Sequence, residues 1–142
     1  MPDRHGRITN VLICEDIRQE VSNQNTLVGV YAGDVVVKEF PASIRIAIYA
    51  EYVIVTQAAH DVHIRISYQG ESRYEIMEVT MKVPDSAREG IAFALPPTSL
   101  RISEKGALIV EVRSSDDGDW LQVVAKSVEK GAPASVEAQP LY

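Results

Sequence analysis

The sequence predicts an all-β fold, an antiparallel β-sandwich of eight or nine strands. Three observations carry this prediction. Apolar residues recur at every second position in several segments, which is the period of a strand with one buried face. Turn signals that contain Gly, Pro, Asn or Asp separate these segments at short intervals. The 3.6-residue period of an amphipathic helix is almost absent.

The N-terminal segment 12–37 reads LICEDIRQEVSNQNTLVGVYAGDVVV. It predicts a strand, an amide-rich turn and a second strand, because two apolar runs flank a polar stretch. Asn23 and Asn25 in that stretch tolerate left-handed turn conformations. Helical spacing is confined to 15–24 and 84–90, and each of these stretches is long enough for a short turn of helix.

The middle of the chain alternates most clearly. The set that we expect to face the core is Ile44, Ile46, Ile48, Ala50, Tyr52 and Ile54, followed by Val62, Ile64, Ile66 and Tyr68. The set that we expect to face solvent in the second segment is Asp61, His63, Arg65 and Ser67. Residues 74–83 return as a strand, and the alternation changes parity near Ile76, which predicts a β-bulge there.

The C-terminal half continues as short strands. Ile91, Phe93 and Leu95 alternate, and we expect Pro96 and Pro97 to end that strand because proline cannot donate to a ladder. The sets Leu108–Val112 and Leu121–Ala125 alternate around Asp117-Gly118, a strong hairpin signal. The whole pattern indicates an immunoglobulin-like or C2-like sandwich over residues 1–128, with a flexible C-terminal tail over 129–142.

Composition and charge exclude several classes of function. The 142 residues suit one domain with a sizeable core. The net charge of -6, from 14 basic and 20 acidic side chains, disfavours nucleic-acid binding, which relies on Lys and Arg. No apolar run is long enough to cross a bilayer, and the opening MPDRHGRITN lacks the apolar core of a secretory signal. We therefore expect a cytoplasmic protein that binds neither nucleic acid nor membrane.

Cys14 is the only cysteine, so it cannot form an internal disulfide. Its assistants as a catalytic thiol would be Asp16, His60 and His63. It lies in the apolar run VLIC, where burial beside carboxylates raises a thiol pKa, the wrong direction for a nucleophile. We interpret Cys14 as a buried structural residue.

The segment HDVH and the acidic turn are the candidate metal ligands. His60 and His63 have opposite parity on a strand and project to opposite faces, so we expect a solvated edge rather than zinc. Asp116, Asp117 and Asp119 offer three oxygen donors, whereas calcium prefers six or more. The chain also contains no Gly-rich phosphate loop and no G-x-S-x-G motif. We predict no enzyme activity, no cofactor and no metal.

An amphipathic strip marks the solvent side of the strand 44–54. Its members are Arg45, Tyr49, Glu51 and Val53. Tyr and Arg are enriched at protein interfaces, and sandwich faces and edges suit strand addition or dimerisation. Arg45, Tyr49 and Glu51 are therefore the candidate interface residues.

The opening also carries a signature, CEDIRQEV followed by TLVGVYAGD and FPASI. It resembles the start of a family of small bacterial proteins of uncharacterised function. The resemblance implies a β-rich single domain and brings no activity with it. Within the signature, Arg18 has Asp16, Glu20 or Asp34 as ion-pair partners. We hypothesise that Asp16, Arg18, Tyr31 and Asp34 gather near one end of the sandwich as a binding site.

Two functions of different class follow from these observations. The leading prediction is a non-catalytic protein-interaction or assembly module that binds a protein partner or self-associates. The alternative is a small-ligand-binding or metal-binding protein, with a site at the loop end that carries Asp16, His63 and the acidic turn.

Overall fold

A computed structural model describes residues 5–71, 73–114 and 118–131, with the backbone alone for 73–76. It contains nine strands and, within the described residues, no helix. The strands are β1 (Gly6–Gln19), β2 (Asn25–Val30), β3 (Val35–Val37), β4 (Ala42–Ile54), β5 (His60–Gln69), β6 (Arg73–Val83), β7 (Gly90–Ile102), β8 (Gly106–Arg113) and β9 (Leu121–Lys130).

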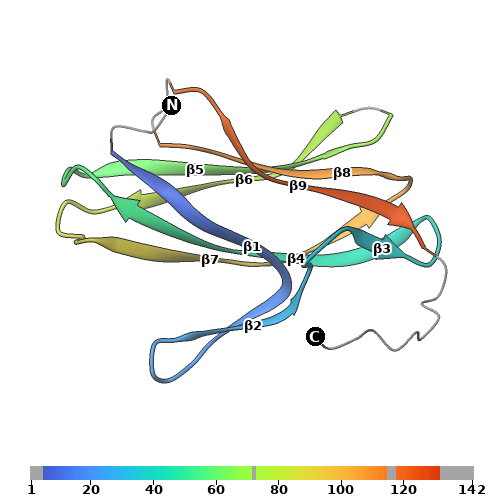
Figure 1. Ribbon diagram of the computed structural model, residues 1–142, viewed down its shortest axis with the longest axis horizontal. Helices are drawn as coiled ribbons and strands as arrows, with labels where there is room; N and C mark the ends of the chain where they lie inside the picture. The colour runs from blue at the N-terminus through green and yellow to red at the C-terminus, as the bar shows by residue number, and fades with distance from the viewer. Residues whose placement is uncertain (1–4, 72, 115–117, 132–142) are drawn as a thin grey trace, which may run out of the picture.

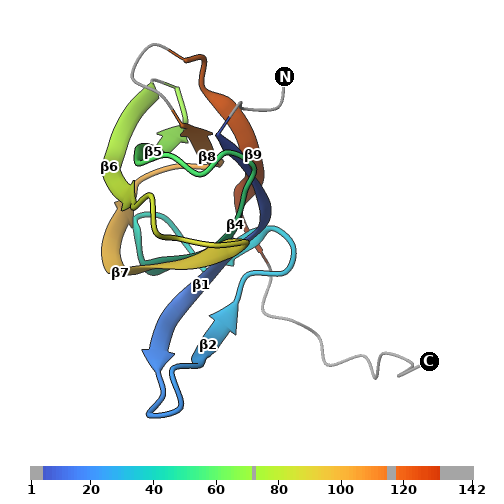
Figure 2. The same cartoon turned by 90° about the vertical axis from the view of Figure 1, so that its left-hand side faces the viewer.

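Two curved sheets face each other as a β-sandwich, as the alternation predicted (Figures 1 and 2). The four-stranded sheet has the order β2-β1-β4-β7, and the five-stranded sheet has the order β3-β9-β8-β5-β6. All pairs are antiparallel except β3–β9, where Val35–Val37 runs parallel to the end of β9. The predicted antiparallel sandwich is thus present, with one parallel pair at that short edge. β9 ends at Lys130, two residues past the expected domain boundary, and residues 132–142 lie outside the described part of the chain.

The core between the sheets contains the residues that alternation placed there. Ile46, Ile48, Ala50 and Tyr52 of β4 are buried, as are the inward residues of β5 from Val62 to Tyr68. Burying each large apolar side chain contributes about 1.5–3 kcal/mol, so these two strands supply much of the stabilisation. The two buried tyrosines keep polar partners: Tyr68 donates its hydroxyl to the Glu104 carbonyl, and Tyr52 pairs with His60.

Two local predictions, on β6 and on β7, have clear outcomes. The bulge near Ile76 is confirmed, because Ile66 pairs with Met77 while Ser67 pairs with Glu75, which leaves residue 76 as the extra one. Pro96 and Pro97 do not end their strand. β7 continues to Ile102 through a register shift at the prolines, and the missing donors are tolerated because β7 is an edge strand.

Neither short helical stretch forms a helix. Residues 15–19 belong to β1, and 84–89 form a turn in which the Ala87 amide donates to the Pro84 carbonyl. Tertiary pairing overrides weak local helix propensity in both places.

The outer side of β5 differs from the sequence expectation. His63 and Ser67 were expected to face solvent, but both are buried. β5 lies between β6 and β8, so neighbouring side chains cover its outer face. Thr80 hydrogen-bonds His63 at 2.9 Å, and Arg65 pairs with Glu111.

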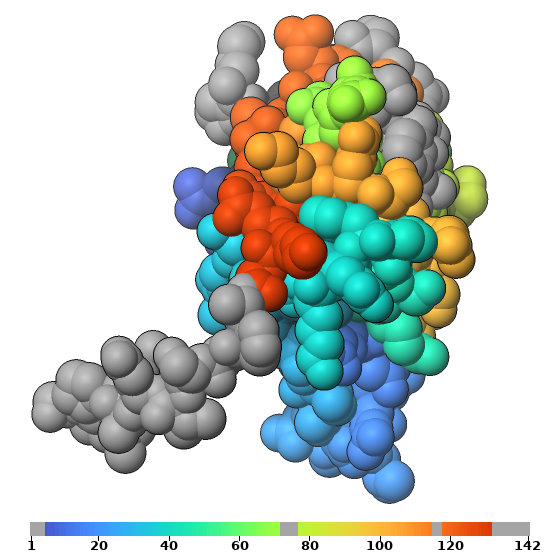
Figure 3. Space-filling view, turned by 90° about the vertical axis from the view of Figure 1, so that its right-hand side faces the viewer, coloured from blue at the N-terminus to red at the C-terminus, as the bar shows by residue number. Residues whose placement is uncertain are grey.

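β1 changes partners along its length. Gly6–Cys14 pairs with β4, and Cys14–Gln19 pairs with β2, so Cys14 is the one residue that pairs with both strands. Beyond Cys14 the strands β1 and β2 form a two-stranded hairpin that projects from the sandwich (Figures 1 and 2). In the space-filling view this hairpin is a lobe that extends beyond the end where β9 finishes (Figure 3).

The described residues contain no helix with the length and apolar character needed to cross a membrane.

Candidate functional site

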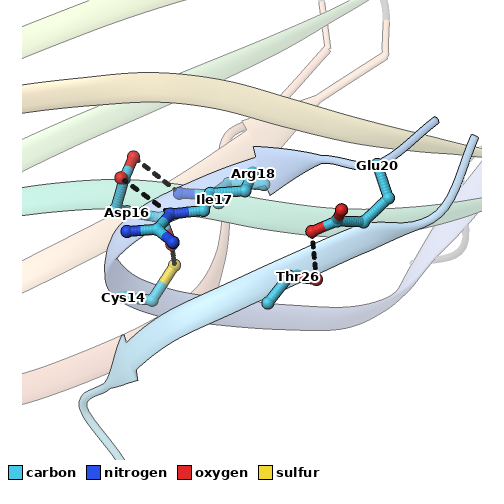
Figure 4. A network of polar contacts seen from close by, with 6 residues as sticks. All are labelled: Cys14, Asp16, Ile17, Arg18, Glu20 and Thr26. Carbon is cyan, nitrogen blue, oxygen red and sulfur yellow. Dashed lines mark hydrogen bonds and ion pairs between the residues drawn. The ribbon is translucent and has the colours of Figure 1, made fainter.

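The four residues hypothesised as a binding site lie along the β1–β2 hairpin and the loop that follows it. Asp16 and Arg18 occupy β1 on one face of the hairpin, with Arg18 Nε 4.0 Å from Asp16 Oδ2 (Figure 4). Tyr31 follows β2, and Asp34 is exposed in the loop before β3. The structure brings Asp16 and Arg18 together, whereas the Tyr31 hydroxyl points to the main chain of Arg45.

The Asp16–Arg18 pair is an exposed contact. The side chains of Arg18 and Asp16 are 69% and 35% exposed, and such pairs contribute between zero and about 1 kcal/mol. The second Asp16 oxygen, Oδ1, accepts from the Ile17 amide at 2.9 Å. Glu20, another suggested partner for Arg18, accepts instead from the Thr26 hydroxyl across the hairpin at 2.9 Å. These contacts shape the hairpin and leave the Arg18 guanidinium accessible.

Tyr31 fixes the place where β1 leaves β4. Its amide donates to the Ile13 carbonyl at 2.9 Å, and its hydroxyl donates to the Arg45 carbonyl at 3.0 Å. Arg45 lies just beyond Ala47, the last β4 residue that pairs with β1. Burial raises the pKa of the Tyr31 hydroxyl, and the nearby Glu15 carboxylate adds to the increase. A neutral hydroxyl is therefore retained as a donor at this junction.

Cys14 is sealed from solvent, with 0% of its surface exposed. Two carbonyl oxygens accept from its single S–H in turn, that of Asp16 at 3.3 Å from the sulfur and that of Ala47 at 3.7 Å. Burial is the main cause that raises the pKa of this thiol, and the Asp16 carboxylate also raises it. The direction agrees with the sequence expectation and does not favour a nucleophile.

The side of the sheet on which Cys14 lies was not expected. Ile13 and its partner Ile48 point into the core, so Cys14 and its partner Ala47 point to the opposite, outer face of the four-stranded sheet. Cys14 is thus buried without belonging to the core between the sheets.

The outer face of the four-stranded sheet is apolar at its centre. Along this face Val30 pairs with Cys14, and Leu12 pairs with Tyr49, which in turn pairs with the exposed Ala94. Leu12 is 41% exposed and Val30 is 43% exposed. We call the accessible members of this set the outer patch: Leu12, Val30, Tyr49 and Ala94.

Polar residues border the outer patch. The Glu51 carboxylate accepts from the Asn10 amide at 2.5 Å and from the Tyr49 hydroxyl at 3.2 Å. Arg45 is exposed at the other end of the same face of β4. All three predicted interface residues, Arg45, Tyr49 and Glu51, therefore share this face. Sequence reasoning missed Leu12 and Val30, although the non-alternating run VLIC was a signal that apolar residues occupy both faces of β1.

The two candidate histidines project to opposite faces, as their parity predicted. The His60 Nδ1–H donates to the Ala58 carbonyl at 2.7 Å, which leaves Nε2 to accept from the Tyr52 hydroxyl at 2.8 Å. His5 stacks on His60 with ring centroids 4.7 Å apart. Among the described residues no group of three His, Cys, Asp or Glu side chains is placed to hold a metal ion. Asp119 is exposed, while Asp116 and Asp117 lie outside the described residues.

A partly open space lies between the ends of the two sheets, lined by Tyr52, Val112, Arg113 and Leu121 among others. Its volume is about 100 Å³, well below the roughly 300–1,000 Å³ of typical ligand sites. A shallow surface hollow of about 450 Å³ lies beside Tyr31 and β3. The larger space is therefore an open depression beside the hairpin and not an enclosed pocket.

Comparison of the sequence with protein-family models and with curated proteins gives no match. The resemblance of the segment CEDIRQEV–TLVGVYAGD to uncharacterised bacterial proteins stays a prediction.

Proposed function

We propose that this protein is a non-catalytic protein-interaction module that binds its partner through the outer face of the four-stranded sheet. The observation that carries the proposal is the outer patch, where Leu12 and Val30 each expose more than two-fifths of their surface on neighbouring strands. Contiguous apolar surface bordered by polar residues is typical of protein-binding sites.

The residues around the outer patch support the same reading. Tyr49 presents a ring whose hydroxyl already has a partner in Glu51, so contact with a partner need not leave a buried hydroxyl unpaired. Arg45 and the Asn10–Glu51 pair supply the polar rim. Tyr and Arg are the side chains that most often anchor protein interfaces.

The alternative of a ligand or metal site at one loop end has less support. It groups Asp16 with His63, but Asp16 lies on the outer side of the four-stranded sheet and His63 on the outer side of the five-stranded sheet. The two side chains therefore cannot converge on one small ligand.

A comparison of two charge substitutions tests the proposal. Leu12→Glu places a carboxylate in the outer patch, and Val55→Glu places one at an exposed position in the β4–β5 connection. Each variant is expressed in the native cells with an affinity tag, and retained proteins are quantified against wild type. We expect Leu12→Glu to retain at least about tenfold less of a partner that wild type retains, which corresponds to a loss of roughly 1.4 kcal/mol in binding free energy. We expect Val55→Glu to retain the same amount as wild type. Equal retention by both variants, with both proteins folded, would remove the outer patch from the proposal.

A further inference from the structure

The edges of the two sheets are not equally protected against pairing with another strand. β7 carries Pro96 and Pro97 with a register shift, and β6 carries the bulge at residue 76 and the charged Glu78 and Lys82. β3 is only three residues long. Prolines, bulges, charges and short length are the devices by which natural proteins block edge pairing. Three of the four strands at the sheet edges, β3, β6 and β7, therefore have a feature that blocks edge pairing.

β2 is the exception among these edges. Its sequence NTLVGV contains no charged residue and no proline, and its pairs with β1 keep one register, with Gly29 (φ +66°) as the one residue of left-handed backbone. It also lies at the end of its sheet, with only β1 as neighbour. Its outward main-chain groups are therefore open to a further strand.

The hairpin that carries β2 has little support of its own. Beyond Cys14, the residues of β1 pair with β2 alone, because the pairing with β4 stops at Ala47. An isolated two-stranded ribbon is at best marginally stable in water. A third and fourth strand would supply the missing pairing.

We propose that a second copy of this chain adds its own β2 antiparallel to the first, across a twofold axis at Val28. This inference goes beyond the proposed function, because the second copy contacts the β2 edge and leaves the outer patch free for its own partner. In this register Val28 faces Val28 of the second copy, and Thr26 faces the second copy's Val30, all on the outer face. The two four-stranded sheets join into one eight-stranded sheet, and the two outer patches become parts of a continuous face.

Electrostatics permit this pairing although the whole chain is acidic. β2 has no ionisable side chain, and two carboxylates lie beside it on the shared face: Asp16, which pairs with Val28, and Glu20, which accepts from the Thr26 hydroxyl. The two Glu20 carboxylates of a dimer are as far apart as the two Thr26 residues, about 14 Å along the strands. The two Asp16 residues of a dimer are separated by three strand spacings, or about 14 Å. That separation exceeds the Debye length of about 8–10 Å at physiological salt, so their repulsion is largely screened. An uncharged edge can pair with a copy of itself without charge repulsion. A copy of β3, β6 or β7 would instead face the short length, the bulge and charges, or the prolines that protect that edge.

Cysteine cross-linking tests both the dimer and its register. Val28→Cys places two thiols directly opposite each other across the axis, at a cross-strand Cβ separation of about 4.5–5.5 Å. Val21→Cys is the control, since Val21 is fully exposed at the hairpin tip. In the proposed dimer the two tips are about 40 Å apart, from about 3.4 Å per residue along antiparallel strands. The native Cys14 stays in both variants because it is buried.

We expect oxidation to cross-link Val28→Cys at least about tenfold faster than Val21→Cys, although Val21 is the more exposed position. We also expect light scattering to show a fraction of wild-type dimer that increases with concentration, and a monomer for Val28→Lys that still unfolds in one cooperative transition. Cross-linking of Val28→Cys without preference over Val21→Cys would overturn the β2 pairing even if a dimer forms. A wild-type monomer at all concentrations up to about 1 mM would overturn self-association, and the Leu12→Glu experiment would still decide the proposed function.

Discussion

The outer face of the five-stranded sheet contains a charge cluster whose energetic role can be measured. Arg65 of β5 donates from Nε and Nη2 to the same Glu111 oxygen of β8, at 3.2 and 3.0 Å. Trp120 covers the pair, with the guanidinium carbons of Arg65 and Arg113 4.1 and 4.5 Å from its ring centroid. Glu111→Gln removes the carboxylate and leaves two guanidinium groups against one indole.

The structure sets the size of the expected effect. The side chains of Arg65 and Glu111 are only 20% and 15% exposed. Breaking a fully buried pair costs about 3–5 kcal/mol, and breaking an exposed pair costs between zero and about 1 kcal/mol. For a pair that is about four-fifths buried we expect a loss of about 2 kcal/mol in the free energy of unfolding, or roughly 4–8 °C in melting temperature for a chain of this length.

A double-mutant cycle measures the coupling directly. Glu111→Gln, Arg65→Met and the double variant are unfolded in urea, and the fluorescence of Trp120, the only tryptophan, reports the transition. Methionine retains an apolar stem against the indole, so the cycle isolates the charge interaction. Arg18→Gln serves as the exposed-pair control and is expected to change stability by less than about 0.5 kcal/mol. A coupling energy between residues 65 and 111 no larger than the stability change of the control would refute the reasoning, because the pair would then behave as a surface ion pair.

Three further predictions concern β1, β2 and their junction. Gly29→Ala is expected to cost about 1–2 kcal/mol of unfolding free energy in a denaturant titration, because Gly29 has φ +66° and a Cβ there would meet the Glu15 side chain; an unchanged midpoint would contradict this. Tyr31→Phe removes the bond to the Arg45 carbonyl, and a loss of about 1 kcal/mol should speed amide hydrogen exchange in 15–30 more than in the rest of the sandwich; uniform exchange would show that the hydroxyl does not hold the hairpin. Burial raises the pKa of the Cys14 thiol above its ordinary 9.0, so the folded state keeps the proton that the unfolded state loses. Stability should therefore fall as pH increases above about 9, and Cys14→Ala should remove that part of the pH dependence; identical alkaline profiles would contradict it.

Alternation was a sufficient guide wherever one face of a strand is apolar and the other polar. β4 and the inward side of β5 follow it because the period of two is a property of the local backbone. The bulge at residue 76 was also visible, since an extra residue exchanges the two faces and leaves a change of parity in the sequence.

Features that depend on the neighbouring strand were not visible in the sequence. His63 and Ser67 have the polarity and parity of solvent-facing residues, yet they are buried because β6 and β8 flank them. The prolines of β7 are tolerated because that strand has a neighbour on one side only. Sheet order is a tertiary property, so a single strand sequence does not contain it.

The same limit applies to the candidate site. Tyr31 was grouped with Asp16, Arg18 and Asp34 on the strength of a shared signature, but its hydroxyl is used where β1 leaves β4. No sequence pattern marks the residue at which a strand changes partners, because the change follows from the curvature of the sheet and the pairing of a distant segment.

The run VLIC connects the fold with the proposed function. Val11 and Ile13 pack against the core, while Leu12 and Cys14 lie on the outer face, so β1 is apolar on both sides over these four residues. A strand that is apolar on both sides is typical of sheets covered on both faces. Within the described residues the core covers one face, Cys14 is sealed by its neighbours on the other, and Leu12 is left 41% exposed. The missing alternation in VLIC is thus the sequence feature that a covering partner would explain. Leu12 is the position at which a substitution measures the loss of that partner most directly.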